Sequence, residues 1–178
     1  MRDLTKLPSA FDPVAMTCRA IVETPEGSRS KFDFDPGSGL FRLHSLLPEG
    51  MTFPLDFGFI PSTRAEDGDP LDAMVFTDEP SPVGALIDVR IVGVIAADQN
   101  GAAGRVRNDR IIAVAQVSHL YQAVQTLDDL GKAYVDGLTR FWTTKGEIEG
   151  KGFRVLGVHG PDEAVDLVRQ ASEAAQET

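Results

Sequence analysis

The chain has 178 residues, of which 42% are hydrophobic, and it carries 17 Lys and Arg against 27 Asp and Glu, for a formal net charge of -10. This length supports a single domain, residues 1–178, with a sizeable core. The negative charge repels nucleic-acid backbones and anionic lipid head groups, so we expect neither nucleic acid nor a membrane as a partner.

The sequence shows no feature that directs the chain to a membrane or out of the cell. No apolar run approaches the roughly 20 residues that a membrane helix needs, and the first six residues lack the apolar stretch of a signal peptide. We therefore expect a cytoplasmic protein. Its single cysteine, Cys18, can form no intrachain disulfide and lies in an apolar-rich stretch, which favours a half-buried packing role.

Short β-branched or alternating runs dominate the first two thirds of the chain, each bounded by Gly, Pro, Asp or Asn. The expected strands are Arg19–Glu23, Lys31–Asp35, Leu40–Ser45, Ala73–Thr77, Ile87–Ala96 and Ile111–Val117. The segment Asp98–Asn108 is polar and contains two glycines, so we expect a loop with freedom to move.

The last third of the chain changes to a helical period. Apolar residues recur at helical spacing over Leu120–Leu127 and, more strongly, over Val135–Trp142, with Gly131 as a break between them. A further strand is expected over Phe153–Val158, and a terminal helix from Pro161 onward. Strands followed by helices favour an antiparallel barrel with helices packed outside it, and not alternating βαβ units.

The acidic segment Asp67-Gly68-Asp69-Pro70-Leu71-Asp72 carries three carboxylates within six residues. If its first part is extended, Asp67 and Asp69 project to the same side, and a turn at Pro70 can bring Asp72 back towards them. Three negative charges at such short distances require cations to offset their repulsion. Magnesium meets this need, because it binds few carboxylates, several waters and the phosphate oxygens of a substrate.

Local sequence alone leaves a second interpretation of the acidic segment open. Asp, Gly and Pro are all common turn formers, so a plain surface turn is about equally supported. A calcium loop of the EF-hand type is excluded, because Leu71 stands at the fifth position and no glycine at the sixth. The sequence also lacks a phosphate loop, a His-Glu-x-x-His motif, a Gly-x-Ser-x-Gly motif and a dinucleotide-binding glycine motif.

The residues before the acidic segment extend this pattern. Phe57-Gly58-Phe59-Ile60 precedes it, and together they resemble the soluble (family I) inorganic pyrophosphatases, whose signature is Asp-x-Asp-Pro-apolar-Asp after an aromatic-Gly-aromatic-Ile segment. Other matching segments follow the family's order: Ile21–Pro25, Lys31–Asp33, Val92–Val94 and Ile111–Val114. The resemblance covers the chain from about Cys18 to Gly157.

The resemblance implies a mainly β fold with α-helices: a five-stranded, OB-like antiparallel barrel flanked by two helices, with a wet acidic cavity at its mouth. It implies hydrolysis of inorganic pyrophosphate to two phosphates by metal-activated water. The implied cofactor is Mg2+, several ions per subunit, with other divalent ions as substitutes. Bacterial members of the family commonly form hexamers, so we expect a homo-oligomer, with six copies as the first choice.

The resemblance also implies roles for individual acids. Asp67 and Asp72 match metal ligands, and Glu23 matches an acid that binds a further metal. Asp69 matches the carboxylate that accepts a proton from the attacking water. Without the resemblance, Glu23 would equally be an ordinary solvated residue at the end of a strand.

Basic residues are implied to hold the substrate. Lys31 and Lys145 match lysines that bind phosphate, and Arg110 stands where the family usually has a lysine, preserving the charge and offering a forked grip. His44 aligns with an arginine that contacts phosphate, and Arg42 lies near enough to substitute for it. Taken alone, Lys145 and Arg110 would be surface charges and Lys31 part of the wet face of a strand.

Other departures from the family pattern concern the third metal site. A strict alignment puts Asn108 on a metal-ligand aspartate, with Asp109 one position later. Asp98 matches another acid only after a one-residue shift. Phe57 replaces a tyrosine and removes a hydroxyl from the site.

These departures spare the three catalytic acids, so pyrophosphate hydrolysis is the main hypothesis. Hydrolysis of another small phosphoanhydride or organic diphosphate is the second. A catalytically silent phosphate-binding or assembly module is the third.

Overall fold

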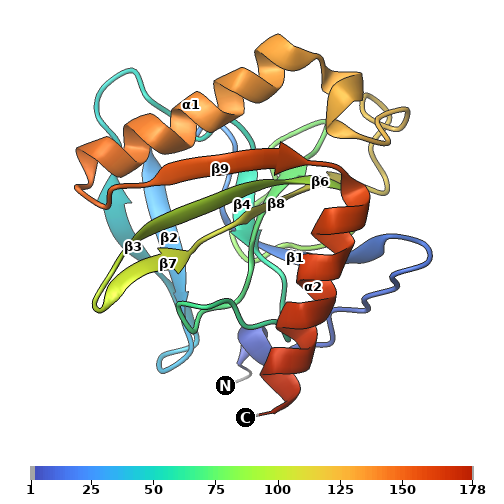
Figure 1. Ribbon diagram of the computed structural model, residues 1–178, viewed down its shortest axis with the longest axis horizontal. Coiled ribbons are helices and arrows are strands. Elements are labelled where there is room, and N and C mark those ends of the chain that lie inside the picture. Colours follow the sequence, from blue (N-terminus) through green and yellow to red (C-terminus); the bar gives the residue numbers. More distant parts are fainter. Residues whose placement is uncertain (1–2, 178) are drawn as a thin grey trace.

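Five strands close into a ring at the centre of the protein, which the computed structural model describes for residues 3–177 (Figure 1). In ring order they are β1 (Thr17–Thr24), β4 (Asp56–Phe59), β5 (Asp72–Phe76), β8 (Arg110–Ala115) and β6 (Leu86–Gly101), and β6 pairs back with β1. This confirms the expected mainly β fold with a five-stranded centre and two helices. The expectation of a wholly antiparallel arrangement is wrong, because β5 and β8 pair in parallel. Their relative direction depends on the path of β6 between them, which local patterns do not encode.

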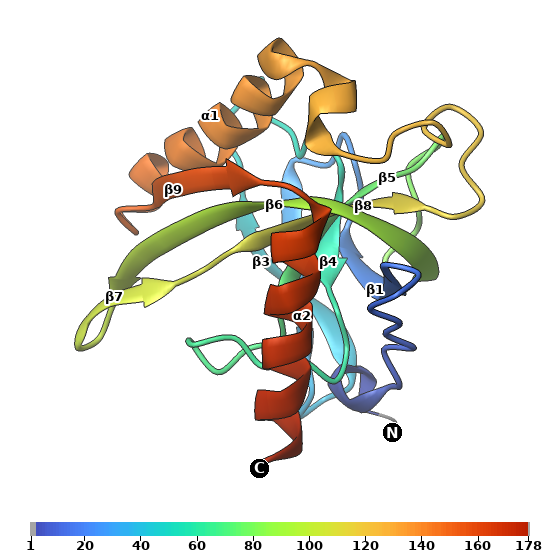
Figure 2. The ribbon, with the colours of Figure 1, turned by 45° about the vertical axis from the view of Figure 1, so that its right-hand side comes forward.

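The long strand β6 has 16 residues and joins the ring to an outer layer. Its first part pairs with β1, its middle with β8 and its last part with β9 (Arg154–His159) and β7 (Gly104–Arg107). The predicted mobile loop over Asp98–Asn108 is therefore wrong, since most of it is a paired β6–β7 hairpin, which projects from the body of the protein (Figure 2). Arg105 fastens this hairpin by donating to the backbone carbonyl of Gly152 at 2.7 Å.

A separate two-stranded hairpin, β2 (Ser30–Asp35) and β3 (Leu40–Leu46), lies outside the ring and matches two predicted strands. The strand β4 was not predicted, because its four residues are all buried and show no alternation. Gly58 in β4 is required by close packing, since a Cβ there would lie 1.8 Å from the carbonyl oxygen of Ile21 in β1. The backbones of β1 and β4 therefore pack closely at this point of the ring.

Two long helices lie in the last third of the chain, one before and one after β9: α1 (Lys132–Ile148) and α2 (Pro161–Gln176). Short 3-10 turns occur at Leu4–Lys6 and Leu127–Leu130. The predicted break at Gly131 is confirmed, with φ of 79° in the left-handed region. The segment before it is a series of turns and not a helix, because the Asp129 carboxylate accepts hydrogen bonds from two preceding backbone amides.

The helices cover opposite faces of the sheet, so the protein has two main apolar clusters. Ala73 and Val75 of β5 pack in the cluster that contains α2, whereas Met74 and Phe76 pack in the cluster that contains α1. This alternation follows from the two-residue period of a strand. Cys18 packs in the first cluster as expected, but it is fully and not half buried. Within residues 3–177 neither helix is long and apolar enough to span a bilayer.

Candidate active site

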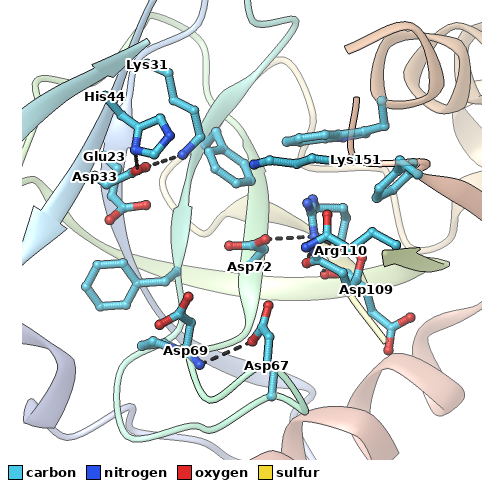
Figure 3. A pocket seen from close by; sticks show the side chains of 18 of the residues that line it. Glu23, Lys31, Asp33, His44, Asp67, Asp69, Asp72, Asp109, Arg110 and Lys151 are labelled. Carbon is cyan, nitrogen blue, oxygen red and sulfur yellow. Dashed lines mark hydrogen bonds and ion pairs between the residues drawn. The ribbon is translucent and has the colours of Figure 1, made fainter. Parts of the chain in front are cut away.

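A cavity of about 310 Å³ opens where the ring meets the β2–β3 hairpin and the end of α1 (Figure 3). The charged and amide residues that line it are Glu23, Lys31, Asp33, His44, Asp67, Asp69, Asp72, Gln99, Asn108, Asp109, Arg110, Lys145, Glu149 and Lys151. Residues more than 120 positions apart in the sequence therefore meet at one place. Asp98 and Arg42 are the two predicted site residues that do not line this cavity.

The acidic segment enters the cavity through a tight turn. Gly68 has a φ of 94°, which an L side chain rarely adopts, and the backbone amide of Asp69 donates to Asp67 Oδ1 at 3.2 Å. Asp67–Asp69 is thus a turn, as one of the two interpretations had it, and not an extended stretch. Asp72 is the first residue of β5 and reaches the cavity from the sheet. The two interpretations of the segment are compatible, because it is a turn former that also places three carboxylates in one cavity.

The environment of these carboxylates opposes their charge. Burial raises the pKa of Asp67, and repulsion from Asp69 adds to the rise. Burial also raises the pKa of Asp72, although Arg110 and Lys31 partly offset it and a quarter of the side chain is exposed. Carboxylates in this situation bind protons or cations more readily than exposed ones do. The acidic segment is therefore suited to hold an added cation.

Glu23 is another acid of the cavity whose pKa is strongly raised. It lies near the end of β1, is buried, and accepts a hydrogen bond from the backbone amide of Phe34 at 2.7 Å. Burial raises its pKa to about 8, with further contributions from Asp72 and Asp33. The strand end that could have been an ordinary solvated edge is thus an interior position.

The donor set fits a hydrated divalent ion better than a cage built from protein alone. Within residues 3–177, no three His, Cys, Asp or Glu side chains lie close enough together to enclose a metal. Magnesium needs only one or two carboxylates when waters and phosphate oxygens complete its shell. Asp67, Asp69 and Asp72 supply such oxygens around the open centre of the cavity (Figure 3).

Basic residues line the side formed by the β2–β3 hairpin. The Asp33 carboxylate lies between two of them: it contacts Lys31 Nζ through one oxygen and His44 Nδ1 at 2.7 Å through the other (Figure 3). Lys31 is largely buried and His44 is about half exposed. Arg42 lies outside, with its side chain 74% exposed and 3.7 Å from Asp35. Of the two candidates for the missing arginine, His44 is the one that reaches the cavity.

The end of α1 contributes a second basic group. Lys145 is 4% exposed at its side chain and pairs with Glu149 at 2.5 Å, one helical turn later. Glu149 also contacts Lys151 at 3.3 Å. Burial lowers the pKa of Lys145, and Glu149 offsets part of that effect. These contacts hold the ammonium group of Lys145 at the cavity wall.

Arg110 is also buried at the cavity wall. Its guanidinium pairs with Asp72 at 2.7 Å and stacks 4.3 Å above the ring centre of Trp142. Trp142 is buried, with Nε1 directed at the sulfur of Met74. It also forms the platform under Arg110, a role that the sequence did not reveal.

Two predicted metal ligands near the β6–β7 hairpin are occupied by arginines. Both oxygens of Asp98 pair with guanidinium groups, from Arg105 and Arg154, and these contacts lower its pKa. Asp109 lines the cavity, but its Oδ1 accepts from Arg107 at 2.8 Å and from the amide of Ala97 at 2.9 Å. Gln99, the neighbour of Asp98, faces the cavity in its place.

The sequence interpretation assigned no role to four polar residues of the cavity: Asp33, Gln99, Glu149 and Lys151. Asp33 could have been found, because it shares one strand face with Lys31. Glu149 also carried a signal, since it follows Lys145 by four residues on a helix. Gln99 and Lys151 reach the cavity only through pairings of β6 with distant strands and turns.

Comparisons with known proteins agree with this geometry. A family model described as inorganic pyrophosphatase matches residues 20–176. An inorganic pyrophosphatase of Methanosarcina acetivorans is 36% identical over 152 residues, covering 85% of this chain and 88% of that protein. One from Synechocystis is 32% identical over 168 residues, covering 94% and 96%. The crystal structure of an inorganic pyrophosphatase from Thermus thermophilus superposes with a TM-score of 0.87 at 29% identity, covering 98% of this chain and 99% of that one.

Proposed function

This chain belongs to the inorganic pyrophosphatase family, and on that premise we propose that it hydrolyses inorganic pyrophosphate to two phosphate ions, using Mg2+. The observation that carries the proposal is the cavity in which Asp67, Asp69 and Asp72 face the cations of Lys31, Lys145 and Arg110. A small, highly charged anion that arrives with divalent ions matches both kinds of wall at once.

Asp69 is the best-placed proton acceptor of the three acids. Asp67 accepts a hydrogen bond from the backbone amide of Asp69, and Asp72 forms an ion pair with Arg110. The carboxylate of Asp69, by contrast, contacts no hydrogen-bond donor or cation among residues 3–177. It is therefore free to take a proton from a water molecule inside the cavity.

The reaction consumes one water and breaks one P–O bond. Asp69 accepts a proton from the water, the water oxygen attacks one phosphorus, and the bond from that phosphorus to the bridging oxygen breaks. The second phosphate leaves with the electron pair of that bond, and Lys31 and Lys145 stabilise its charge. Bound Mg2+ supplies Lewis acidity, which lowers the pKa of water and neutralises phosphate oxygens.

We propose Asp67, Asp72 and Glu23 as the metal ligands of this chain, with the free oxygen of Asp109 as a further candidate. Asp98 is left out, because both of its oxygens already pair with arginines. His44, and not the exposed Arg42, is proposed to contact phosphate beside Lys31. Other divalent ions that prefer oxygen ligands can replace Mg2+ in this scheme.

The decisive test is phosphate release from pyrophosphate with and without Mg2+, for the wild type and Asp69→Asn. The variant keeps the shape of the side chain and removes the proton acceptor, so its kcat should fall by about 10² to 10⁴ while its urea midpoint stays unchanged. Asp162→Asn, an exposed position at the start of α2, is the matched control for the same loss of charge. Full activity in a folded Asp69→Asn protein would rule out this role for Asp69.

A panel of nucleoside and sugar diphosphates separates the main proposal from its alternatives. Release from pyrophosphate alone supports the main function, and release only from organic diphosphates supports the second. Binding of phosphate without turnover supports the third. The cytoplasmic location and the homo-oligomer, with six copies as the first choice, stay predictions from the sequence.

A further inference from the structure

Arg110 lies in a cage of oxygen atoms. Its Nη1 lies 2.7 Å from Asp72 Oδ2, 2.9 Å from the carbonyl oxygen of Asn108 and 3.1 Å from the carbonyl oxygen of Asp109, and it also contacts Asn108 Oδ1. One guanidinium nitrogen of this kind carries two hydrogens, so four acceptors exceed its bonding capacity. Carboxylate, amide and carbonyl oxygens gathered around one point are the ligands that hard cations prefer.

The guanidinium is also fixed in place from its other sides. It stacks 4.3 Å from the ring centre of Trp142 and lies 5.4 Å from that of Phe153 and 5.8 Å from that of Phe57. The Arg110 side chain is 6% exposed. A buried charge that aromatic rings and oxygens both enclose has little freedom to leave its position when the substrate binds.

Most of the side chains beside Arg110 on this wall of the cavity are neutral amides or carboxylates that already pair with arginines. Asn108 and Gln99 line the cavity as amides, and Asp98 turns away to pair with Arg105 and Arg154. This wall therefore offers few free negative charges to a second cation. Asp72 also reaches this wall, and its Oδ2 already pairs with Arg110.

We propose that Arg110 is a built-in cation that occupies one metal position of the cavity, so that the chain binds one divalent ion fewer than a site with aspartate and lysine at positions 108 and 110. The oxygen cage around Nη1 carries this inference. Its meaning rests on the proposed metal-dependent hydrolysis, but ion counting tests it without any turnover. A failure of pyrophosphate hydrolysis and a failure of this inference are therefore distinguishable.

The first test measures Mn2+ binding by equilibrium dialysis, without substrate, in the wild type and in Arg110→Met. Removing the guanidinium frees Oδ2 of Asp72 and takes away the positive charge beside it, so Mn2+ should bind about tenfold or more tightly in the variant. Arg169→Met removes the same charge from an exposed ion pair on α2 and should leave the Mn2+ affinity unchanged. An unchanged or weaker affinity in Arg110→Met would overturn the proposal.

The second test restores a metal position and does not depend on how well Arg110→Met folds. The double variant Asn108→Asp/Arg110→Lys replaces the amide with a carboxylate and the forked cation with a more flexible one. We expect it to bind one more Mn2+ per chain than the wild type. The same number of ions in both proteins, with circular dichroism showing that the double variant is folded, would overturn the proposal equally.

Discussion

The two walls of the cavity handle charge in different ways. Among residues 3–177, the acidic wall formed by Asp67, Asp69 and Asp72 has one ion pair, that of Asp72 with Arg110. The hairpin wall, formed by the end of β6, β7 and the start of β8, pairs its carboxylates with arginines from its own strands and from β9. The acidic wall therefore depends on cations from solution, whereas the hairpin wall provides its own.

Asp72 is the residue that the two walls share, so its substitution should have a larger effect on activity and stability than the other substitutions considered below. Asp72→Asn removes a proposed metal ligand and the partner of Arg110 together. We expect the activity to fall by a factor on the order of 10² or more, and the Mg2+ concentration for half-maximal activity to rise. A magnesium titration of phosphate release measures both quantities.

Stability provides a second measure of the same variant. Breaking a buried ion pair is costly, but the exposure of Asp72 to the cavity reduces the effect, so we expect a loss of about 1–2 kcal/mol in the free energy of unfolding. A magnesium titration that matches the wild type would show that Asp72 serves only the hairpin wall. The two walls would then share no residue.

The difference between the walls also decides how much of the site could be predicted. The acidic wall comes from one short segment, so the spacing of its aspartates and the resemblance to the family were enough to bring its residues to notice. The hairpin wall depends on the strand register that places Asp98 of β6 opposite Arg107 of β7, and on the ion pair of Asp98 with Arg154 of β9. Local composition described this segment as a loop, because Gly101 and Gly104 mark a turn but do not reveal the partners of the strands around it.

The fold shows the same division between local and long-range signals. Alternation and helical spacing located most strands and both long helices. The strand β4 was missed because burial on both faces removes alternation. The parallel pairing of β5 with β8 was missed because direction within a sheet is set by the whole path of the chain.

Glu23 of β1 is a buried carboxylate whose charge the fold opposes, as it does for Asp67 and Asp72 of the acidic wall. Its pKa rises from 4.5 to about 8 in the fold, so the folded state without metal retains a proton that the unfolded state releases. This group therefore lowers the free energy of unfolding progressively as the pH rises from about 4.5 to 8. Between pH 6 and 8 the loss should be about 2 kcal/mol.

The measurement is urea unfolding in a chelator at pH 6 and pH 8, for the wild type and Glu23→Gln. The glutamine keeps an oxygen for the amide of Phe34 and carries no charge, so its stability should fall less across this interval. Added Mg2+ should restore the wild type at pH 8 and have less effect on the variant. If the stability of the two proteins changed equally between pH 6 and pH 8, Glu23 would not be the group that retains the proton.

The smallest effect is expected where charges are already paired. Asp98→Asn removes the carboxylate that holds Arg105 and Arg154, so the urea midpoint should fall slightly, and by less than in Asp72→Asn, with the difference shrinking at acidic pH. The Mg2+ dependence of phosphate release should stay as in the wild type, because neither oxygen of Asp98 is available to a metal. A marked rise in the required Mg2+ would show that Asp98 exchanges its arginines for an ion during turnover, and the hairpin wall would then depend on solution cations as the acidic wall does.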